Sequence, residues 1–273
     1  MKKVLSLGAG VQSSALALMC ERGVFEKPDI AIFADTGDEP SSVYGWLEHL
    51  EGLLSYPVVR VSHGESLRKR SQRVVISKKT GQAYMKGLVP AYVLSPSGEK
   101  GILGRKCTYD HKIMPIRKYL KKWANVRRAE KNVIITQYMG ISLDEIQRMK
   151  PSQVPWIKNT YPLVDAGISR SACKRWLIEN RYPEPPRSAC YYCPFHSARE
   201  WRRLKEDEPD EFLKAVEFER ELQRAIKRVP RMDGTPYLYR SCKPLDEIDF
   251  DREGQNPDQI DLFGNECEGM CGL

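Results

Sequence analysis

The sequence predicts an α/β fold, with a doubly wound, mainly parallel sheet followed by a helical C-terminal part that contains cysteines. Two observations support this fold class. Short apolar runs typical of buried strands alternate with segments whose apolar residues recur at helical spacing. A glycine-bearing turn joins the first strand-like run to the first helical segment. Since strands that alternate with helices connect in parallel, we expect helices on both faces of the sheet.

The same patterns assign the elements in order. Strands are predicted over 4–7, 30–34, 58–61 and 132–138, and helices over 14–22, 41–54 and 112–123. The sheet is expected to be complete at the fourth strand. Helices are predicted over 168–180 and 198–229, and an irregular tail follows from Pro230. We therefore divide the chain into a sheet domain over 1–165, with a basic insertion at about 62–106, and a helical, cysteine-containing region with a tail over 166–273.

The charge balance favours an anionic partner, because 44 lysines and arginines outnumber 36 acidic residues and the net charge is +8. Nucleotides and nucleic acids both qualify. The excess is concentrated in the insertion, where the only acid between Arg68 and Lys106 is Glu99. The basic residues there are Arg68, Lys69, Arg70, Arg73, Lys78, Lys79, Lys86, Lys100, Arg105 and Lys106. This segment is either a solvated surface insertion or a guide for a polyanion.

The turn after the first strand has the composition of a phosphate-binding loop. In Ser6-Leu7-Gly8-Ala9-Gly10-Val11-Gln12-Ser13-Ser14 a strand runs into small residues and then opens a helix. Such a turn directs backbone N–H groups at an anion, and the two serines add hydroxyl donors. The candidate contacts are Ser6, Gly8, Gly10, Gln12, Ser13 and Ser14. A turn built only for packing is the alternative. The loop lacks the Gly-Lys-Ser/Thr of a Walker motif.

Two further turns follow predicted strands at the same edge of the sheet. Asp35-Thr36-Gly37 ends the second strand and places a carboxylate where open α/β sheets bind ligands. Gly140 and Asp144 follow the fourth strand. Both turns also have local explanations, an Asx turn at Asp35 and a capping box from Ser142 to Glu145.

Taken in order, these three segments resemble those of the PP-loop ATP pyrophosphatase superfamily, whose loop reads Ser-Gly-Gly-x-Asp-Ser. Gly10 and Ser13 match that pattern, whereas Gly8, Ala9 and Gln12 replace its Ser, Gly and Asp. The resemblance is closest to the phosphoadenylyl-sulfate (PAPS) reductase-like branch, which includes enzymes of phosphorothioate DNA modification. It implies a PP-loop (HUP-type) sheet and ATP with Mg²⁺. The contacts it implies are those of the first loop together with Asp35, Gly140 and Asp144.

The cysteines add a candidate metal centre. Cys190 and Cys193 lie on one tight turn, at a spacing used for zinc, iron–sulfur clusters and redox pairs. Cys107 lies in a loop similar to the cysteine-bearing loop of PAPS reductases, where two adjacent cysteines are usual. Cys173 is the candidate fourth ligand. The resemblance implies an iron–sulfur centre on these residues, either with Cys173 as the fourth ligand or with an open iron position that holds a sulfur atom, and zinc is the alternative.

The end of the sequence carries two more cysteines, Cys267 and Cys271. The segment resembles the Glu-Cys-Gly-Leu-His tail of PAPS reductases, without the final His. In those enzymes the cysteine is the nucleophile, so Cys267 and Cys271 are the candidate catalytic residues. An end of the chain whose thiols do nothing is the alternative.

These features lead to three functional hypotheses. The first is an ATP-dependent sulfur transferase that adenylates its substrate, releases pyrophosphate and modifies nucleic acid, either tRNA or DNA. A sulfur-donor protein and a second copy of the chain are compatible partners. The alternatives are a PAPS or APS reductase and a zinc-stabilised nucleotide-binding module. We expect a cytoplasmic protein without membrane contact, because Gln12, Ser13 and Ser14 interrupt the one candidate export signal and no stretch could span a bilayer.

Overall fold

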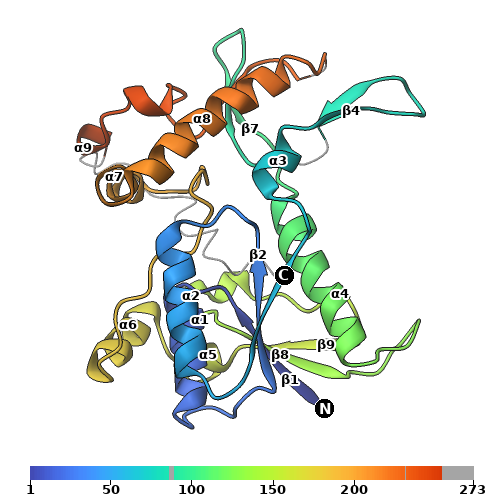
Figure 1. Cartoon of the computed structure of the whole chain (residues 1–273), viewed down its shortest axis with the longest axis vertical. Helices are drawn as coiled ribbons and strands as arrows, with labels where there is room; N and C mark the ends of the chain where they lie inside the picture. The colour runs from blue at the N-terminus through green and yellow to red at the C-terminus, as the bar shows by residue number, and fades with distance from the viewer. Residues whose placement is uncertain (86–88, 231, 254–273) are drawn as a thin grey trace. The chain divides into compact units, whose positions relative to one another are not determined.

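The computed structural model describes residues 1–85, 89–230 and 232–253 of the chain (Figure 1). The described chain forms two compact units. The first unit comprises Met1–His63 and Thr108–Ser188, and the second comprises Gly64–Cys107 and the described residues from Ala189 onward.

A five-stranded parallel sheet forms the centre of the first unit, in the order β3-β2-β1-β8-β9. The strands are β1 (Lys2–Leu7), β2 (Ile30–Asp35), β3 (Val58–Ser62), β8 (Ile135–Met139) and β9 (Ile157–Thr160). The chain passes outward from β1 through β2 to β3 and then returns to pair β8 on the other side of β1. The strand order therefore reverses between β1 and β8, and ligands of open α/β sheets bind at such a reversal.

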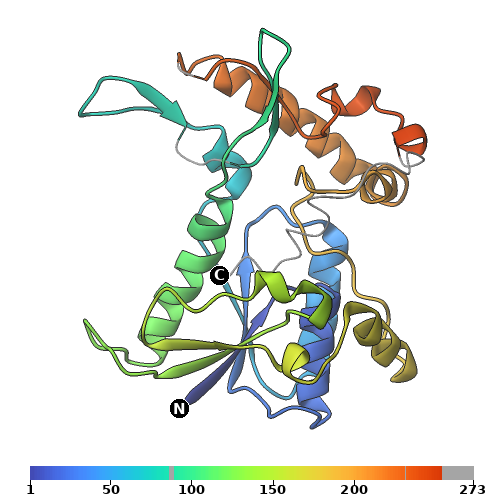
Figure 2. The ribbon, with the colours of Figure 1, turned by 180° about the vertical axis from the view of Figure 1, so that it is seen from behind.

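Helices cover both faces of this sheet (Figures 1 and 2). They are α1 (Val11–Glu21), α2 (Ser41–Leu53), α4 (Met114–Trp123), α5 (Pro162–Asp165) and α6 (Arg170–Glu179), with short η1 (Thr108–Ile113, a π-helix) and η2 (Leu143–Arg148, a 3₁₀-helix). Along β1, Leu5 packs in one core with α1, α2 and α6, whereas Val4 packs with α4 in another. This alternation follows from the two-residue repeat of a strand. The prediction of a doubly wound parallel sheet is confirmed.

The sheet differs from the sequence prediction at its edge. It is not complete at the fourth strand, because β9 pairs with β8 as a fifth. The run Ile157-Lys158-Asn159-Thr160 is only partly buried and mostly polar. An edge strand of this kind lacks the apolar pattern that identified the other four strands.

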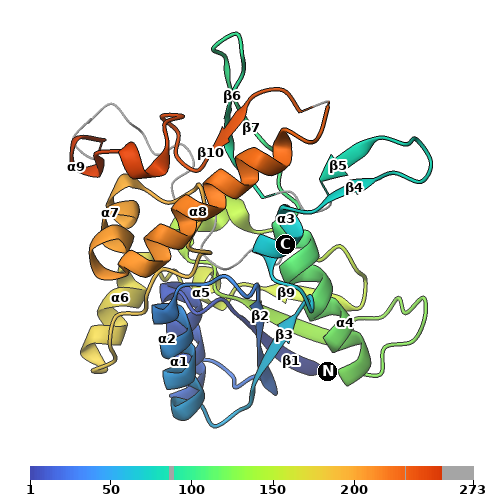
Figure 3. The ribbon, with the colours of Figure 1, turned by 45° about the horizontal axis from the view of Figure 1, so that its top comes forward.

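The second unit combines the insertion with the C-terminal helices. Its elements are α3 (Leu67–Ser71), β4 (Val74–Ile76), β5 (Ala83–Met85), β6 (Tyr92–Leu94), β7 (Lys100–Ile102), α7 (Ala198–Asp207), α8 (Pro209–Ile226), β10 (Thr235–Tyr237), η3 (Leu245–Glu247) and α9 (Phe250–Glu253). Strands β10, β6 and β7 form one sheet, and β4 and β5 form a separate hairpin (Figure 3). The single helix predicted over 198–229 is wrong. Two helices form instead, because Pro209 has no N–H to continue α7 and begins α8.

The boundaries of the two units differ from the predicted domain boundary between residues 165 and 166. Residues 166–188 belong to the first unit because Cys173 and Leu177 of α6 pack into its core. The insertion belongs with the C-terminal helices, since Leu67 packs in the same core as Trp201 and Phe218. No helix within the described residues is long and apolar enough to cross a bilayer.

Candidate nucleotide site

The glycine loop joins β1 to α1 with an unusual backbone. Ala9 has a φ of +60°, in the left-handed region that favours glycine. A side-chain-bearing residue there is strained by about 1–2 kcal/mol. Gly10 precedes the helix in an extended conformation and gives α1 no side-chain cap, and the first turn of α1 contains no acidic residue. No acidic or capping side chain of α1 therefore offsets the partial positive charge at the start of this helix.

The hydroxyls of Ser13 and Ser14, predicted as phosphate donors, hold the loop in place. The backbone N–H of Gly8 donates to Ser13 Oγ at 3.1 Å, and Ser13 Oγ donates to the Gly10 carbonyl at 3.2 Å. Trp46 Nε1 donates to Ser14 Oγ at 2.8 Å. Both serines are buried, as is Ser6 on β1. The groups best placed to meet an anion are therefore the backbone N–H groups of the first turn of α1.

Gly140, just after β8, packs directly against this first turn. A Cβ at Gly140 would lie 2.7 Å from Ser13 Cα and 2.9 Å from Ser13 N, closer than side chains tolerate. Only glycine allows this approach, which joins the loops that follow β1 and β8. The structure thus brings together two segments that the sequence singled out separately.

Gln12 and Asp144 belong to the same cluster. Gln12 Nε2 donates to Ser142 Oγ at 3.4 Å, and Arg170 Nη1 donates to Gln12 Oε1 at 3.4 Å. The backbone N–H of Arg170 donates to Asp144 Oδ1 at 2.9 Å. Burial opposes ionisation of Asp144, but hydrogen bonds from Ser142 and Arg170 outweigh it and lower its pKa. Asp144 is therefore ionised and holds the first residue of α6 through this hydrogen bond. The side chain of Ser142 forms no capping hydrogen bond at η2.

Ser188 lies beside the glycine loop, although sequence reasoning did not single it out. Its Cβ would be 3.7 Å from a Cβ placed on Gly10. The side chain is 1% exposed, and its Oγ makes no hydrogen bond to any residue that the structure describes. A buried hydroxyl without a partner costs about 1–3 kcal/mol, so such a group is normally matched by a ligand or water. The sequence motif nearest to Ser188 is the cysteine pair that begins two residues later at Cys190, and Ser188 is not part of it.

Asp35 lies at the same edge of the sheet, since β2 runs parallel to β1 with Phe33 opposite Leu7. Its Oδ1 accepts hydrogen bonds from Gly37 N and from Tyr44 Oη, each at 2.7 Å. This is the Asx turn that the sequence offered as the local explanation. Asp35 Oδ1 is therefore committed to shaping the turn.

A buried ion pair follows this turn. Lys112 Nζ lies 3.5 Å from Glu39 Oε1, and Thr36 Oγ1 donates to the same oxygen at 3.4 Å. The Glu39 side chain is 1% exposed, and its Oε2 is buried with no partner among the described residues. Lys112 belongs to η1, a π-helix of the kind often found at functional sites. Glu39 and Lys112, which are distant in the sequence, therefore place charged groups at this edge of the sheet. The sequence patterns did not indicate this pair.

Three of the four candidate metal ligands, Cys107, Cys190 and Cys193, lie in the second unit. The backbone N–H of Cys193 donates to the Cys190 carbonyl at 2.9 Å, so these two cysteines form the tight turn that was predicted. Cys107 and Cys190 are partly buried against the core of that unit. Across the described ranges, no three His, Cys, Asp or Glu side chains are grouped as metal ligands.

Cys173 has different surroundings. It is fully buried in the apolar core of the first unit, and burial raises the pKa of its thiol to about 12. These surroundings disfavour the thiolate form that a metal ligand needs. Cys267 and Cys271, the candidate catalytic residues, lie outside the described residues.

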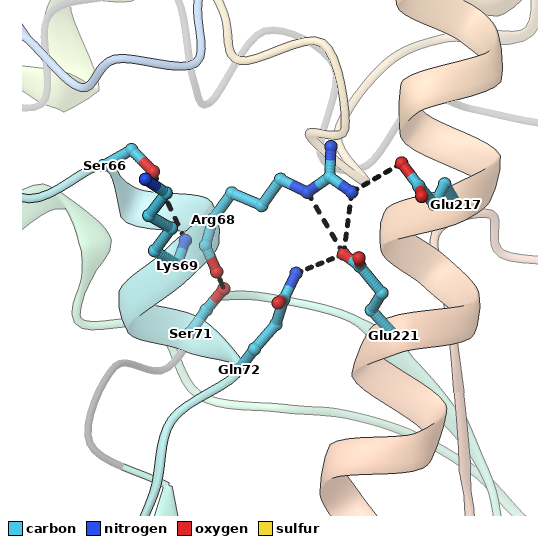
Figure 4. A network of polar contacts seen from close by, with 7 residues as sticks. All are labelled: Ser66, Arg68, Lys69, Ser71, Gln72, Glu217 and Glu221. Carbon is cyan, nitrogen blue, oxygen red and sulfur yellow. Dashed lines mark hydrogen bonds and ion pairs between the residues drawn. The ribbon is translucent and has the colours of Figure 1, made fainter.

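Arg68 of α3 is engaged inside the second unit (Figure 4). Arg68 Nη2 lies 2.7 Å from Glu217 Oε2 and 2.9 Å from Glu221 Oε2, and Gln72 Nε2 also donates to Glu221. Burial opposes the charge of Arg68, but the acids outweigh it and raise its pKa. Arg73 is paired with Glu65. Two members of the predicted polyanion guide are therefore neutralised by the protein itself.

Comparison with known proteins finds a likeness in fold. No family model matches the sequence, and no curated protein is similar to it. The structure is similar to the crystal structure of phosphoadenylyl-sulfate (PAPS) reductase from Candida auris in a phosphate complex. The two chains are 13% identical, the match covers 68% of this chain and 75% of that one, and the TM-score is 0.44.

Proposed function

We propose that the chain is an ATP-dependent sulfur transferase of the PP-loop type that acts on nucleic acid. An oxygen of the acceptor attacks the α-phosphate of ATP, pyrophosphate leaves, and the acceptor becomes adenylated. Hydrosulfide supplied by a donor protein then attacks the activated atom, a bond to sulfur replaces the bond to the adenylated oxygen, and that oxygen leaves with AMP. The observation that carries the proposal is the uncapped start of α1 at the point where the strand order reverses.

The geometry of α1 supports phosphate binding. In the same unit α6 begins with Ser169, whose side chain accepts a hydrogen bond from Ala172 N, so α6 supplies its own cap. Helix α1 begins with Gly10 and supplies none. The side chain of Ser188, whose buried Oγ has no partner among the described residues, lies beside Gly10 at the start of this helix. Preorganised donors of this kind stabilise the negative charge that develops on departing pyrophosphate.

The sulfur-transfer step rests on the sequence resemblance and on the cysteines. Cys107, Cys190 and Cys193 lie in one unit of the structure, and cysteine thiolates are the usual ligands of iron–sulfur clusters. A bound cluster would supply an iron position that carries sulfur. Mg²⁺ would accompany ATP. Cys267 and Cys271 are proposed to take part as thiol nucleophiles.

Equilibrium binding of ATP and release of pyrophosphate test the proposal. Gly10→Asp places a carboxylate where phosphate is expected, and Ser188→Ala removes one donor. Losing a hydrogen bond to a charged group costs roughly 1.5–3 kcal/mol, so we expect ATP affinity to fall by about 10-fold or more in each variant. Ser241→Ala is the matched control, because Ser241 Oγ is also buried without a partner among the described residues but belongs to the second unit.

Undiminished ATP affinity in Gly10→Asp would contradict the phosphate site. If Ser188→Ala and Ser241→Ala lose ATP affinity equally, Ser188 is not part of the phosphate site. Metal analysis of the same protein, purified without oxygen, decides the second step. Iron that is lost in Cys190→Ser supports sulfur transfer, whereas zinc alone favours the binding module.

A further inference from the structure

We propose that the β4–β5 hairpin is the surface on which this protein docks duplex DNA. The inference rests on the proposed function, since it names the acceptor class and the part of the chain that contacts it. It follows from the hairpin's pairing, its tip and its exposed side chains.

The hairpin is an isolated two-stranded ribbon with a fixed base. Val75 pairs with Tyr84 and Ile76 with Ala83, and neither strand pairs with another strand in the described part of the chain. Met85 at the base is buried in the core of the second unit. Figures 1 and 3 show the ribbon extending away from α8. Because an isolated ribbon of this kind is only marginally stable in water, its base must anchor it.

The tip of the ribbon is held in one conformation. The backbone N–H groups of Ser77 and Gly81 donate to the carbonyls of Gln82 and Ser77, each at 2.8 Å. Gly81 has a φ of +65°, which a residue with a side chain rarely adopts. The turn therefore presents Lys78 and Lys79 at the far end of the ribbon as a fixed pair.

The charge at this tip is available to a partner. Lys78 and Lys79 are exposed, and neither forms an ion pair with any described residue. No acidic residue occurs between Val74 and Met85. Helix α3 differs, because Arg68 is held by Glu217 and Glu221. The hairpin tip therefore offers phosphate a positive charge that Arg68, held by its two glutamates, does not.

Two apolar side chains flank the charged tip. Ile76 is 69% exposed and Tyr84 is 44% exposed. Side chains alternate across a ribbon, and Tyr84 lies opposite Val75, so Ile76 and Tyr84 occupy opposite faces. A basic tip with an apolar side chain on each face suits a groove with phosphates along its edges and bases along its floor.

The dimensions of the ribbon select the duplex. The major groove of B-form DNA is about 12 Å wide and admits a two-stranded ribbon. The major groove of A-form RNA is deep and narrow and does not admit side chains to its floor. The proposal therefore commits to duplex DNA and excludes the helical stems of tRNA.

Fluorescence anisotropy with a duplex DNA of random sequence, titrated over a salt series, tests the proposal on the full chain. In Lys78→Ala/Lys79→Ala we expect the slope of log affinity against log salt to flatten by about 1.8, since each lost phosphate contact on duplex DNA removes about 0.9. Lys121→Ala/Lys122→Ala removes the same charge from exposed residues of α4 in the first unit. That control should keep at least 90% of the wild-type slope.

The outcomes distinguish failure of the hairpin proposal from failure of the proposed function. Equal flattening in both double variants would overturn the hairpin proposal. A wild-type chain that binds tRNA through Lys78 and Lys79 but not DNA would overturn the commitment to DNA. Binding of ATP without binding of either nucleic acid would overturn the nucleic-acid acceptor and leave the phosphate site standing. ATP affinity should be unchanged in both double variants, which also verifies that they fold.

Discussion

The glycine loop of the first unit and the basic insertion of the second use their polar residues in comparable ways. In the loop, the Ser13 hydroxyl bonds to Gly8 and Gly10, which leaves backbone N–H groups to face a ligand. In the insertion, Arg68 is bound by two glutamates, whereas Lys78 and Lys79 remain exposed. In each region a side chain whose type suggests a ligand contact, Ser13 or Arg68, instead bonds to the protein itself. The groups available for binding are the ones that found no internal partner.

The largest effect is expected at Gly140, on which the shape of the glycine loop depends. In Gly140→Ala the new Cβ would lie 2.7 Å from Ser13 Cα, so backbone must shift. We expect the free energy of unfolding to fall by roughly 1–3 kcal/mol, as for overpacked cores, and ATP binding to be lost. Urea denaturation and binding calorimetry measure the two effects.

Gly10→Ala is the matched control for that substitution. Gly10 has a φ of −95°, and its nearest contact for a new Cβ is an ordinary 3.7 Å to Ser188. The variant should unfold close to the wild type while binding ATP more weakly. If Gly140→Ala keeps both wild-type stability and affinity, the loops after β1 and β8 are not coupled.

A smaller effect, dependent on pH, is expected at Glu219 in the second unit. Its buried carboxylate accepts hydrogen bonds from Leu238 N at 2.7 Å and Leu245 N at 2.9 Å. Burial raises the pKa of Glu219 to about 6 from 4.5, although those two bonds oppose the shift. The folded chain therefore binds this proton more tightly than the unfolded chain. The stabilising contribution is complete below pH 4.5 and is lost as the pH rises through 6.

The shift corresponds to about 2 kcal/mol. The difference in unfolding free energy between wild type and Glu219→Gln should therefore fall by roughly 1.5 kcal/mol between pH 4.5 and pH 6.5. Urea denaturation at several pH values measures it. A difference that stays constant with pH would show that Glu219 does not titrate in this range.

The smallest effect is expected at Arg68, which tests the comparison directly. Its partner Glu217 is exposed, and its partner Glu221 is partly exposed, a pair of a kind that contributes about 0–1 kcal/mol. Arg68→Ala should lower the free energy of unfolding by about 1 kcal/mol or less and leave the salt dependence of DNA binding unchanged. A flattened salt slope in this variant would place α3 in the DNA interface and weaken the distinction between α3 and the hairpin.

Sequence patterns anticipated most of the sheet and some of the candidate site. Strands β1, β2 and β8 were found because they are buried in the sheet, which requires apolar runs, and β3 was found because its sequence is rich in valine. Strand β9 was missed because Lys158, Asn159 and Thr160 are polar, whereas β3 at the opposite edge keeps an apolar run. The chemistry of proline predicts the helix break at Pro209, but the helical spacing of apolar residues on both sides favoured one continuous helix. Ser188 had no local pattern to reveal it.

The sequence by itself determined that this protein forms a parallel sheet covered on both faces and opens its first helix with glycine rather than with a capping side chain. These features depend on neighbours within a few residues, so local periodicity and residue type are enough to define them. Only the tertiary structure decided which polar groups are already used. Trp46 is 32 residues from Ser14, and Glu221 is 153 residues from Arg68. Partners so distant along the chain meet only through the packing of separate elements, and their hydrogen bonds then determine which donors and charges remain for a ligand.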